Sequence, residues 1–166
     1  GEAIKVHYLD VDKRFNVILD NYSKSLCDFA ILEEVIYSSL LIKKDVIEID
    51  EFDQDYRNIM NYGHTFGHAL ETVTRYQVPH GMAVSFGIGI ANYLSWKIGF
   101  LSPQDREEME KLVIKNTAEV SISLDTLDSF WSALSRDKKN FDGDTVAILT
   151  KGFGQMFKHK IALNEE

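Results

Sequence analysis

Apolar residues recur at three- and four-residue steps over most of the chain, which is the period of helices that pack against a core. From about Ser25 to Glu48 this pattern predicts one such helix, with its apolar positions at Phe29, Leu32, Val35, Ile36, Leu40 and Val46. A second predicted helix begins near Asp53, which can cap it, and runs to about Thr74. Pro79 closes the loop that follows.

Residues 81–101 form the most apolar stretch, but glycines and polar residues interrupt it. Its continuous apolar runs are far shorter than the ~20 residues that a membrane span needs, so we predict a buried core helix over about 81–98 and no membrane partner. Ser102 followed by Pro103 is typical of a helix start and predicts a helix through Lys115. A further helix is expected over about 126–136.

The pattern changes near the end of the chain. Residues 145–149 and 157–163 are short runs typical of strands, and they flank the glycine-containing segment 151–155, which predicts a hairpin. No strand–glycine-rich loop–helix unit of the dinucleotide-binding kind occurs in the sequence. We therefore predict a single, mainly α domain over residues 1–166, with one small β hairpin near the C-terminus.

Composition narrows the classes of partner. The 166 residues include 18 basic and 26 acidic ones, a formal net charge of -8, which disfavours nucleic acid but leaves room for a small anion at a local cluster of cations. One cysteine, Cys27, excludes an internal disulfide framework and a cysteine-rich zinc site. The first residues lack the features of a signal peptide, so we expect a cytoplasmic protein.

The helix predicted over residues 53–74 carries polar residues along a stripe where helices normally carry apolar ones: Arg57, Asn61, His64 and His68. Gly63 and Gly67 lie beside the two histidines, and each costs about 1 kcal/mol of helix stability relative to alanine. Glycines in such positions suggest that another backbone or a ligand approaches closely.

Three histidines in this region are candidate metal ligands. His64 and His68 have the four-residue spacing of zinc-binding helices, and His80 follows the predicted helix, where a returning loop could bring it over the same stripe. Such a pair alone is more often a surface or core feature, but the third histidine, the glycines and the Arg57–Asn61 stripe favour a metal site. His7 and His159 have no such neighbouring residues in the sequence, and we expect structural or exposed roles for them.

These segments resemble a known family. NYGHTFGHALE followed by PHGMAV is similar to the signature of dehydroquinate synthase and its relatives, the sugar-phosphate cyclases. The opening GEAIK and the later RDKKNFDG also resemble elements of that family, so the similarity covers nearly the whole chain.

The resemblance implies three ligands for Zn2+, or for another divalent metal such as Co2+: Glu2, His64 and His80. It implies that His68 faces the substrate, and that protons and phosphate are handled by Lys5, Lys43 and His68. The implied substrate-binding residues are Arg57, Asn61, Lys138 and Lys139, of which one of the two late lysines contacts phosphate. Lys5 follows Glu2 by three residues, which puts both on one face of a helix.

The same resemblance implies the metal- and substrate-binding half of an enzyme whose N-terminal, NAD+-binding half is absent from this chain. The implied reaction is the zinc- and NAD-dependent cyclisation of a sugar phosphate with elimination of phosphate, as in the shikimate route to aromatic amino acids. The isolated chain is then expected to be inactive. Its expected partners are a phosphorylated sugar-type substrate, the N-terminal half and, as one possible assembly, a second copy in a homodimer.

Several alternatives stay open. Met82 stands where dehydroquinate synthases carry glutamate and is closer to cyclases of the 2-deoxy-scyllo-inosose synthase type, whereas Arg57 suits a carboxylated substrate. Asp53 also departs from the family, where glutamate is expected. A metal-dependent polyol dehydrogenase and a non-catalytic helical metal-binding module are the other hypotheses. Without the resemblance, a solvated face would be the preferred interpretation of Lys43, Lys138 and Lys139.

Overall fold

The computed structural model describes residues 1–11, 14–118, 120, 122–135 and 144–162, so Lys138 and Lys139 lie outside the described residues. Its elements are α1 (Glu2–Tyr8), α2 (Phe15–Ser25), α3 (Phe29–Ile49), the 3-10 helix η1 (Tyr56–Asn61), α4 (His64–Val73), α5 (His80–Lys97), α6 (Pro103–Thr117), the 3-10 helix η2 (Leu124–Thr126), α7 (Leu127–Ser135), β1 (Asp144–Thr150) and β2 (Met156–Ala162). The described part is mainly α with one antiparallel hairpin, which confirms the predicted fold class.

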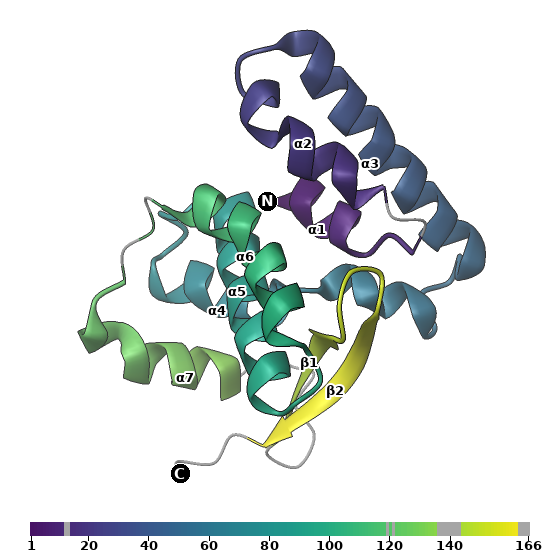
Figure 1. Cartoon of the computed structure of the whole chain (residues 1–166). Helices are drawn as coiled ribbons and strands as arrows, with labels where there is room; N and C mark the ends of the chain where they lie inside the picture. The colour runs from purple at the N-terminus through teal and green to yellow at the C-terminus, as the bar shows by residue number, and fades with distance from the viewer. Residues whose placement is uncertain (12–13, 119, 121, 136–143, 163–166) are drawn as a thin grey trace.

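Figure 1 shows two groups of helices joined by α1. The helices α2 and α3 lie side by side in one group, and α4, α5, α6 and α7 form the other. α1 contacts α2 and α3 on one side and α5 on the other, so the first turn of the chain lies where the two groups meet.

The centre of the larger group is α5. Ala83, Val84, Ile88 and Ala91 are fully buried, and α5 is in contact with α4, α6, α1 and β1. This confirms the buried helix predicted from about residue 81. Among the helices of the described residues, none is long and apolar enough to cross a membrane.

The helix predicted from Ser25 begins four residues later. α2 ends at Ser25, and α3 begins at Phe29 because the Asp28 carboxylate caps it, accepting hydrogen bonds from the amides of Ala30 and Ile31. The two helices are therefore separate, and the chain turns between them.

Only part of the predicted apolar face of α3 is core. Val35 and Val46 are buried together with Ile42, but Phe29, Ile36 and Leu40 are 81%, 50% and 59% exposed. α3 contacts α1 and α2 along one narrow face, so its remaining apolar residues stay outside the core of the described chain.

The single helix predicted over residues 53–74 is wrong. Residues Tyr56–Asn61 form η1, Tyr62 then takes an extended ψ of 125°, and Gly63 takes the left-handed φ of 78° from which α4 begins. The left-handed conformation suits glycine, and it reorients the chain before His64. Arg57 and Asn61 therefore lie on a different element from His64 and His68, and the polar stripe is not continuous.

Asp53 is also not the cap that the sequence suggested. It has a positive φ of 55° and is exposed. The carboxylate of Asp50 orders this loop instead, because it accepts hydrogen bonds from the backbone amides of Gln54, Asp55 and Arg57. These backbone hydrogen bonds lower the pKa of Asp50.

The two glycines beside the histidines do lie against another backbone, as predicted. A Cβ atom at Gly63 would be 2.6 Å from the Val84 carbonyl oxygen, and one at Gly67 would be 2.9 Å from the Ala83 carbonyl oxygen. Gly87 of α5 faces them, because its Cβ would be 2.8 Å from the Gly67 nitrogen and closer still to the Gly63 carbonyl. α4 and α5 thus approach at backbone distance, which fixes the start of α4 against the middle of α5.

The remaining predicted elements are confirmed within small shifts of their ends. α6 has Ser102 as its N-cap, which accepts from the amide of Asp105, and Pro103 in its first turn. In the hairpin, Thr145 pairs with Ile161 and Thr150 with Met156. The Thr150 amide donates to Ser95 Oγ of α5 at 3.0 Å, so the hairpin is tied to the central helix.

His7 has the structural role that we predicted. It is fully buried on α1, and its ring nitrogens lie 2.8 Å from the Ala3 carbonyl oxygen and 3.0 Å from Ser38 Oγ of α3. Burial lowers the pKa of His7, although the Ala3 carbonyl opposes this effect.

The lowered pKa of His7 predicts a pH-dependent stability. Below the ordinary imidazole pKa of about 6.5 the unfolded chain takes up a proton that the folded chain refuses, so the free energy of unfolding decreases as the pH falls. Urea unfolding at several pH values between 8 and 5, with a chelator present, should show a steeper decrease for the wild type than for His7→Asn. Equal slopes in the two proteins would contradict this assignment.

Candidate metal and substrate site

Three potential metal ligands meet where the two helix groups join. Glu2 is in the first turn of α1, His64 begins α4 and His80 begins α5, and one donor atom from each lies within 4.8 Å of the others. Glu2 Oε1 is 3.6 Å from His64 Nε2 and 3.8 Å from His80 Nε2. The structure therefore brings together the carboxylate and the two imidazoles that the sequence singled out as ligands.

Close backbone packing places Glu2 beside His80. A Cβ atom at Gly1 would lie within 2.6 Å of Gly81 Cα, so the start of α1 is in direct contact with the start of α5. Ile4 and Tyr8 are fully buried and fix α1, and the Tyr8 hydroxyl donates to the Met109 carbonyl oxygen of α6 at 2.7 Å.

The two carboxylate oxygens of Glu2 have different partners, because Lys5 binds one of them. Its side chain is buried, and Nζ donates to Glu2 Oε2 at 2.9 Å, which leaves Oε1 facing the histidines. Burial disfavours the charged form of Glu2, but the hydrogen bond and charge of Lys5, helped by His64 and His80, hold its pKa below the usual value. The carboxylate is therefore ionised and ready to accept a cation at neutral pH.

His64 is oriented by the backbone that precedes it. Its Nδ1 lies 3.3 Å from the Tyr62 carbonyl oxygen, so a proton on Nδ1 leaves the Nε2 lone pair directed toward Glu2. Burial, followed by the charge of Lys5, lowers the pKa of His64 to about 4. Its imidazole is thus neutral at physiological pH, which is the form that binds metals.

His80 is exposed and has a partner that the sequence did not reveal. Its Nδ1 lies 2.9 Å from Glu71 Oε1, and Glu71 is buried on α4. Glu71 ends the NYGHTFGHALE segment, but only the folding of α5 back onto α4 shows that it reaches His80. His68, Glu71 and His80 form a second group with donor atoms within 4.8 Å of one another.

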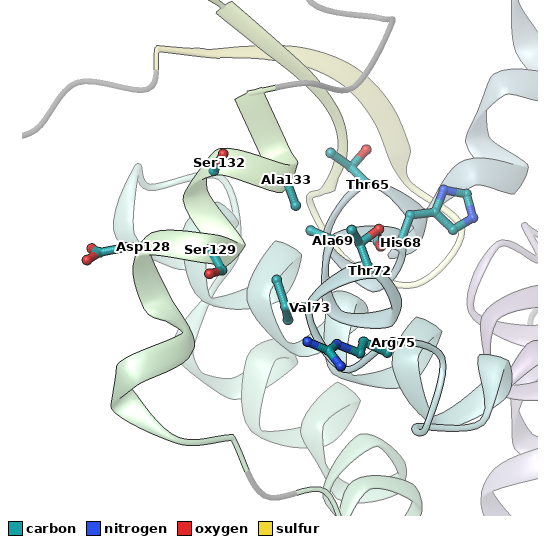
Figure 2. Close-up of a pocket in the computed structure, with 10 residues that line it drawn as sticks. All are labelled: Thr65, His68, Ala69, Thr72, Val73, Arg75, Asp128, Ser129, Ser132 and Ala133. Atoms are coloured by element: carbon teal, nitrogen blue, oxygen red, sulfur yellow. Dashed lines mark hydrogen bonds between the residues drawn. The ribbon is translucent and has the colours of Figure 1, made fainter.

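His68 lies next to the first group. Its ring centroid is 5.2 Å from that of His64 and 6.1 Å from that of His80, to which it is nearly parallel. Figure 2 shows its side chain directed away from α7, at the rim of a groove of about 780 Å³ between α4 and α7. Hydroxyl groups and Arg75 give this groove a polar lining, and it meets the histidines only through His68.

The other predicted residues differ in how closely the structure ties them to this cluster. Lys43 on α3 is exposed, and its charge adds to the lowering of the Lys5 pKa, for which burial is the main cause. Arg57 donates from Nη1 to the Glu51 carbonyl oxygen, and Asn61 ends η1, three residues before His64. Within the described ranges no hydrogen bond or ion pair joins Arg57 or Asn61 to the histidines.

Comparisons with known proteins found matches over most of this chain. Residues 1–140 match the family described as 3-dehydroquinate synthase C-terminal. The 3-dehydroquinate synthase of Helicobacter hepaticus is 34% identical over 146 residues, which are 87% of this chain and 41% of that protein. The 3-dehydroquinate synthase of Campylobacter curvus is 35% identical over 155 residues, 93% of this chain and 44% of that protein.

Two solved structures share the fold. A 2-deoxy-scyllo-inosose synthase complexed with carbaglucose-6-phosphate, NAD+ and Co2+ has a TM-score of 0.69 at 25% identity, covering 79% of this chain and 38% of that one. The 2-epi-5-epi-valiolone synthase of Streptomyces hygroscopicus has a TM-score of 0.73 at 18% identity, covering 99% of this chain and 46% of that one. The chain thus spans less than half the length of the relatives that it matches.

Proposed function

Because this chain belongs to the 3-dehydroquinate synthase C-terminal family, we propose that it is the metal- and substrate-binding half of a sugar-phosphate cyclase. The observation that carries the proposal is the convergence of Glu2, His64 and His80 from three separate helices. The family and this cluster together support a phosphate-eliminating carbon–oxygen lyase as the activity of the whole protein.

The donor set fits a catalytic divalent metal. One carboxylate and two imidazoles are a common ligand set for catalytic zinc, which leaves a position open for substrate, and the Co2+ named with one structural relative is compatible with the same donors. Glu2, His64 and His80 would hold the ion. When bound, it supplies Lewis-acid polarisation of a substrate oxygen.

The cations around this position suit an anionic substrate. Lys5 and Lys43 can orient phosphate as point charges, and His68 can accept or donate a proton beside them. Arg57 can hold a carboxylate in a bidentate manner, with Asn61 as an amide partner. Lys138 and Lys139 complete the proposed substrate-binding set, one of them on the phosphate.

The cofactor and partners belong to the same proposal. We assign NAD+ mainly to a part of the parent protein outside residues 1–166, because two structural relatives contain NAD+ and the curated relatives are more than twice as long as the matched region. Residues 1–166 then act as one domain, with a homodimer as a possible assembly and the cytoplasm as the compartment.

Two hypotheses for the substrate remain. The relatives at 34% and 35% identity are named 3-dehydroquinate synthases, which favours dehydroquinate's linear phosphate precursor and hence the shikimate pathway. Met82 and the likeness to a 2-deoxy-scyllo-inosose synthase with a bound glucose 6-phosphate analogue favour glucose 6-phosphate. We place the dehydroquinate reaction first, because the sequence identity to those enzymes is higher.

Assays of the intact parent protein decide among these hypotheses. We expect the parent protein to release inorganic phosphate from dehydroquinate's linear precursor in the presence of NAD+ and zinc. We expect no release by residues 1–166 alone, whose sequence shows no glycine-rich dinucleotide-binding unit. Release from glucose 6-phosphate alone would reassign the substrate. Oxidation of simple polyols without phosphate release would favour a dehydrogenase, and metal binding without any turnover would favour a non-catalytic module.

A further inference from the structure

We infer that Glu71 is a positioning residue, whose carboxylate holds the His80 imidazole in the tautomer and orientation that turn Nε2 toward Glu2 and His64. This inference rests on the proposed metal site and extends it to a residue behind the ligands. Its basis is the 2.9 Å contact between Glu71 Oε1 and His80 Nδ1.

The helix packing fixes Glu71 at this place. Glu71 follows Gly67 by four residues, so it lies one turn further along the face of α4 that contacts α5. Its side chain is nine-tenths buried, whereas the His80 ring that it meets is half exposed. The Tyr76 amide donates to the Glu71 carbonyl oxygen at 2.7 Å, so the backbone that follows α4 is hydrogen-bonded to this residue.

A buried carboxylate needs a compensating partner. Among the described residues, His80 Nδ1 is the hydrogen-bond partner of the Glu71 side chain. A carboxylate oxygen accepts a hydrogen bond, so Nδ1, the ring nitrogen that meets it, is the one that carries the proton. Nε2 then carries the lone pair, and this is the atom that lies 3.8 Å from Glu2 Oε1.

His64 is held in the same way by a different acceptor. Its Nδ1 lies beside the Tyr62 carbonyl oxygen, and its Nε2 also faces Glu2 Oε1. Both imidazoles are therefore anchored through Nδ1 and present Nε2 to one point. Metal-binding histidines generally have such an acceptor behind them, and its removal lowers metal affinity about 10- to 100-fold.

The alternative is that Glu71 is itself a ligand, in the group with His68 and His80. An ion bound between Glu71 and His80 Nδ1 would displace the 2.9 Å contact between these two groups. The group of Glu2, His64 and His80 needs no such rearrangement, because its donor atoms already face one another. The geometry therefore favours Glu71 as an anchor.

Zinc titrations of five variants, Glu2→Gln among them, test this inference. Glu71→Ala should raise the zinc dissociation constant about 10- to 100-fold. Glu71→Gln keeps a carbonyl acceptor but loses the charge, so it should fall between Glu71→Ala and the wild type. Glu110→Ala is the matched control, because Glu110 on α6 also pairs with a neighbouring side chain, Arg106, and should leave the affinity unchanged. His68→Ala should also keep the affinity, since His68 is not an anchored ligand.

A second readout does not depend on zinc. In metal-free protein at pH 8, ring nitrogen NMR should show His80 protonated on Nδ1 in the wild type and a mixture of tautomers in Glu71→Ala. If Glu71→Ala does not fold, Glu71→Gln decides through the same two measurements. A zinc affinity within twofold of the wild type in a folded Glu71 variant overturns the inference. So does the loss of zinc binding from both Glu71→Ala and His68→Ala if Glu2→Gln still binds zinc, because the ion would then lie in the second group. A wild type that binds no zinc refutes the proposed metal site, while the tautomer of His80 still tests the role of Glu71.

Discussion

Gly87→Ala is expected to cause the largest loss of stability of any glycine-to-alanine change in α5. The new Cβ would lie 2.8 Å from the Gly67 nitrogen and would overlap the Gly63 carbonyl, and both obstacles are backbone atoms. α4 would have to move away from α5 as a whole, because neither atom can rotate aside. We expect a loss of about 3 kcal/mol or more in the free energy of unfolding, at or above the upper end of the usual range for overpacked cores.

Gly89→Ala is the matched control, two residues further along the same helix. Its Cβ would meet only the Val113 Cγ1 atom at 3.3 Å, and a side chain of that kind can shift by a few tenths of an ångström. Helix propensity then favours alanine by about 1 kcal/mol, so this variant should be near neutral or slightly stabilised. Urea unfolding of both proteins measures the contrast, and similar stabilities would refute the proposed backbone contact.

His64→Ala and His80→Ala are each expected to abolish stoichiometric zinc binding. Each removes one of three donors, and loss of a direct donor should exceed the roughly 100-fold effect of removing a residue behind a ligand. Metal analysis after gel filtration, together with a competition titration against a chelator of known affinity, measures the loss.

Two other histidines provide the comparison. His159 lies on β2 against Phe100, far along the chain from the three donors, and His159→Ala should bind zinc as the wild type does. His68→Ala should also retain zinc while impairing turnover of the intact parent. Unchanged metal content in both ligand variants, or an equal loss in His68→Ala, would remove the ligand assignment.

The sequence predicted best those elements whose signals are local. The Ser102–Pro103 start of α6 and the two strand-like runs around the turn at 151–155 are short-range patterns, and the structure contains both elements. α2 gave no comparable signal and was not predicted. The break at Gly63 was also missed, because its left-handed φ goes with a contact to Val84, twenty-one residues later.

The site residues also differ in whether a local sequence pattern could predict them. The resemblance to a family identified Glu2, His64 and His80, although their separation along the chain hides their proximity. The role of Glu71 is different, because its pairing with His80 exists only after α5 docks on α4, whereas Lys5 pairs with Glu2 within α1. Lys5 was predicted from its place in a motif, whereas Glu71 carried no chemical signal beside the two histidines.

The position of Glu2 in the first turn of α1 has a consequence for folding. About sixty residues separate it from His64, so a cation held between them closes a long loop, much as a cross-link does. An unfolded chain has no such pre-assembled cage, and occupancy would therefore favour the native state by mass action. Unfolding of α1 alone would be enough to release the ion. Retention of the ion would therefore report whether the two helix groups remain joined.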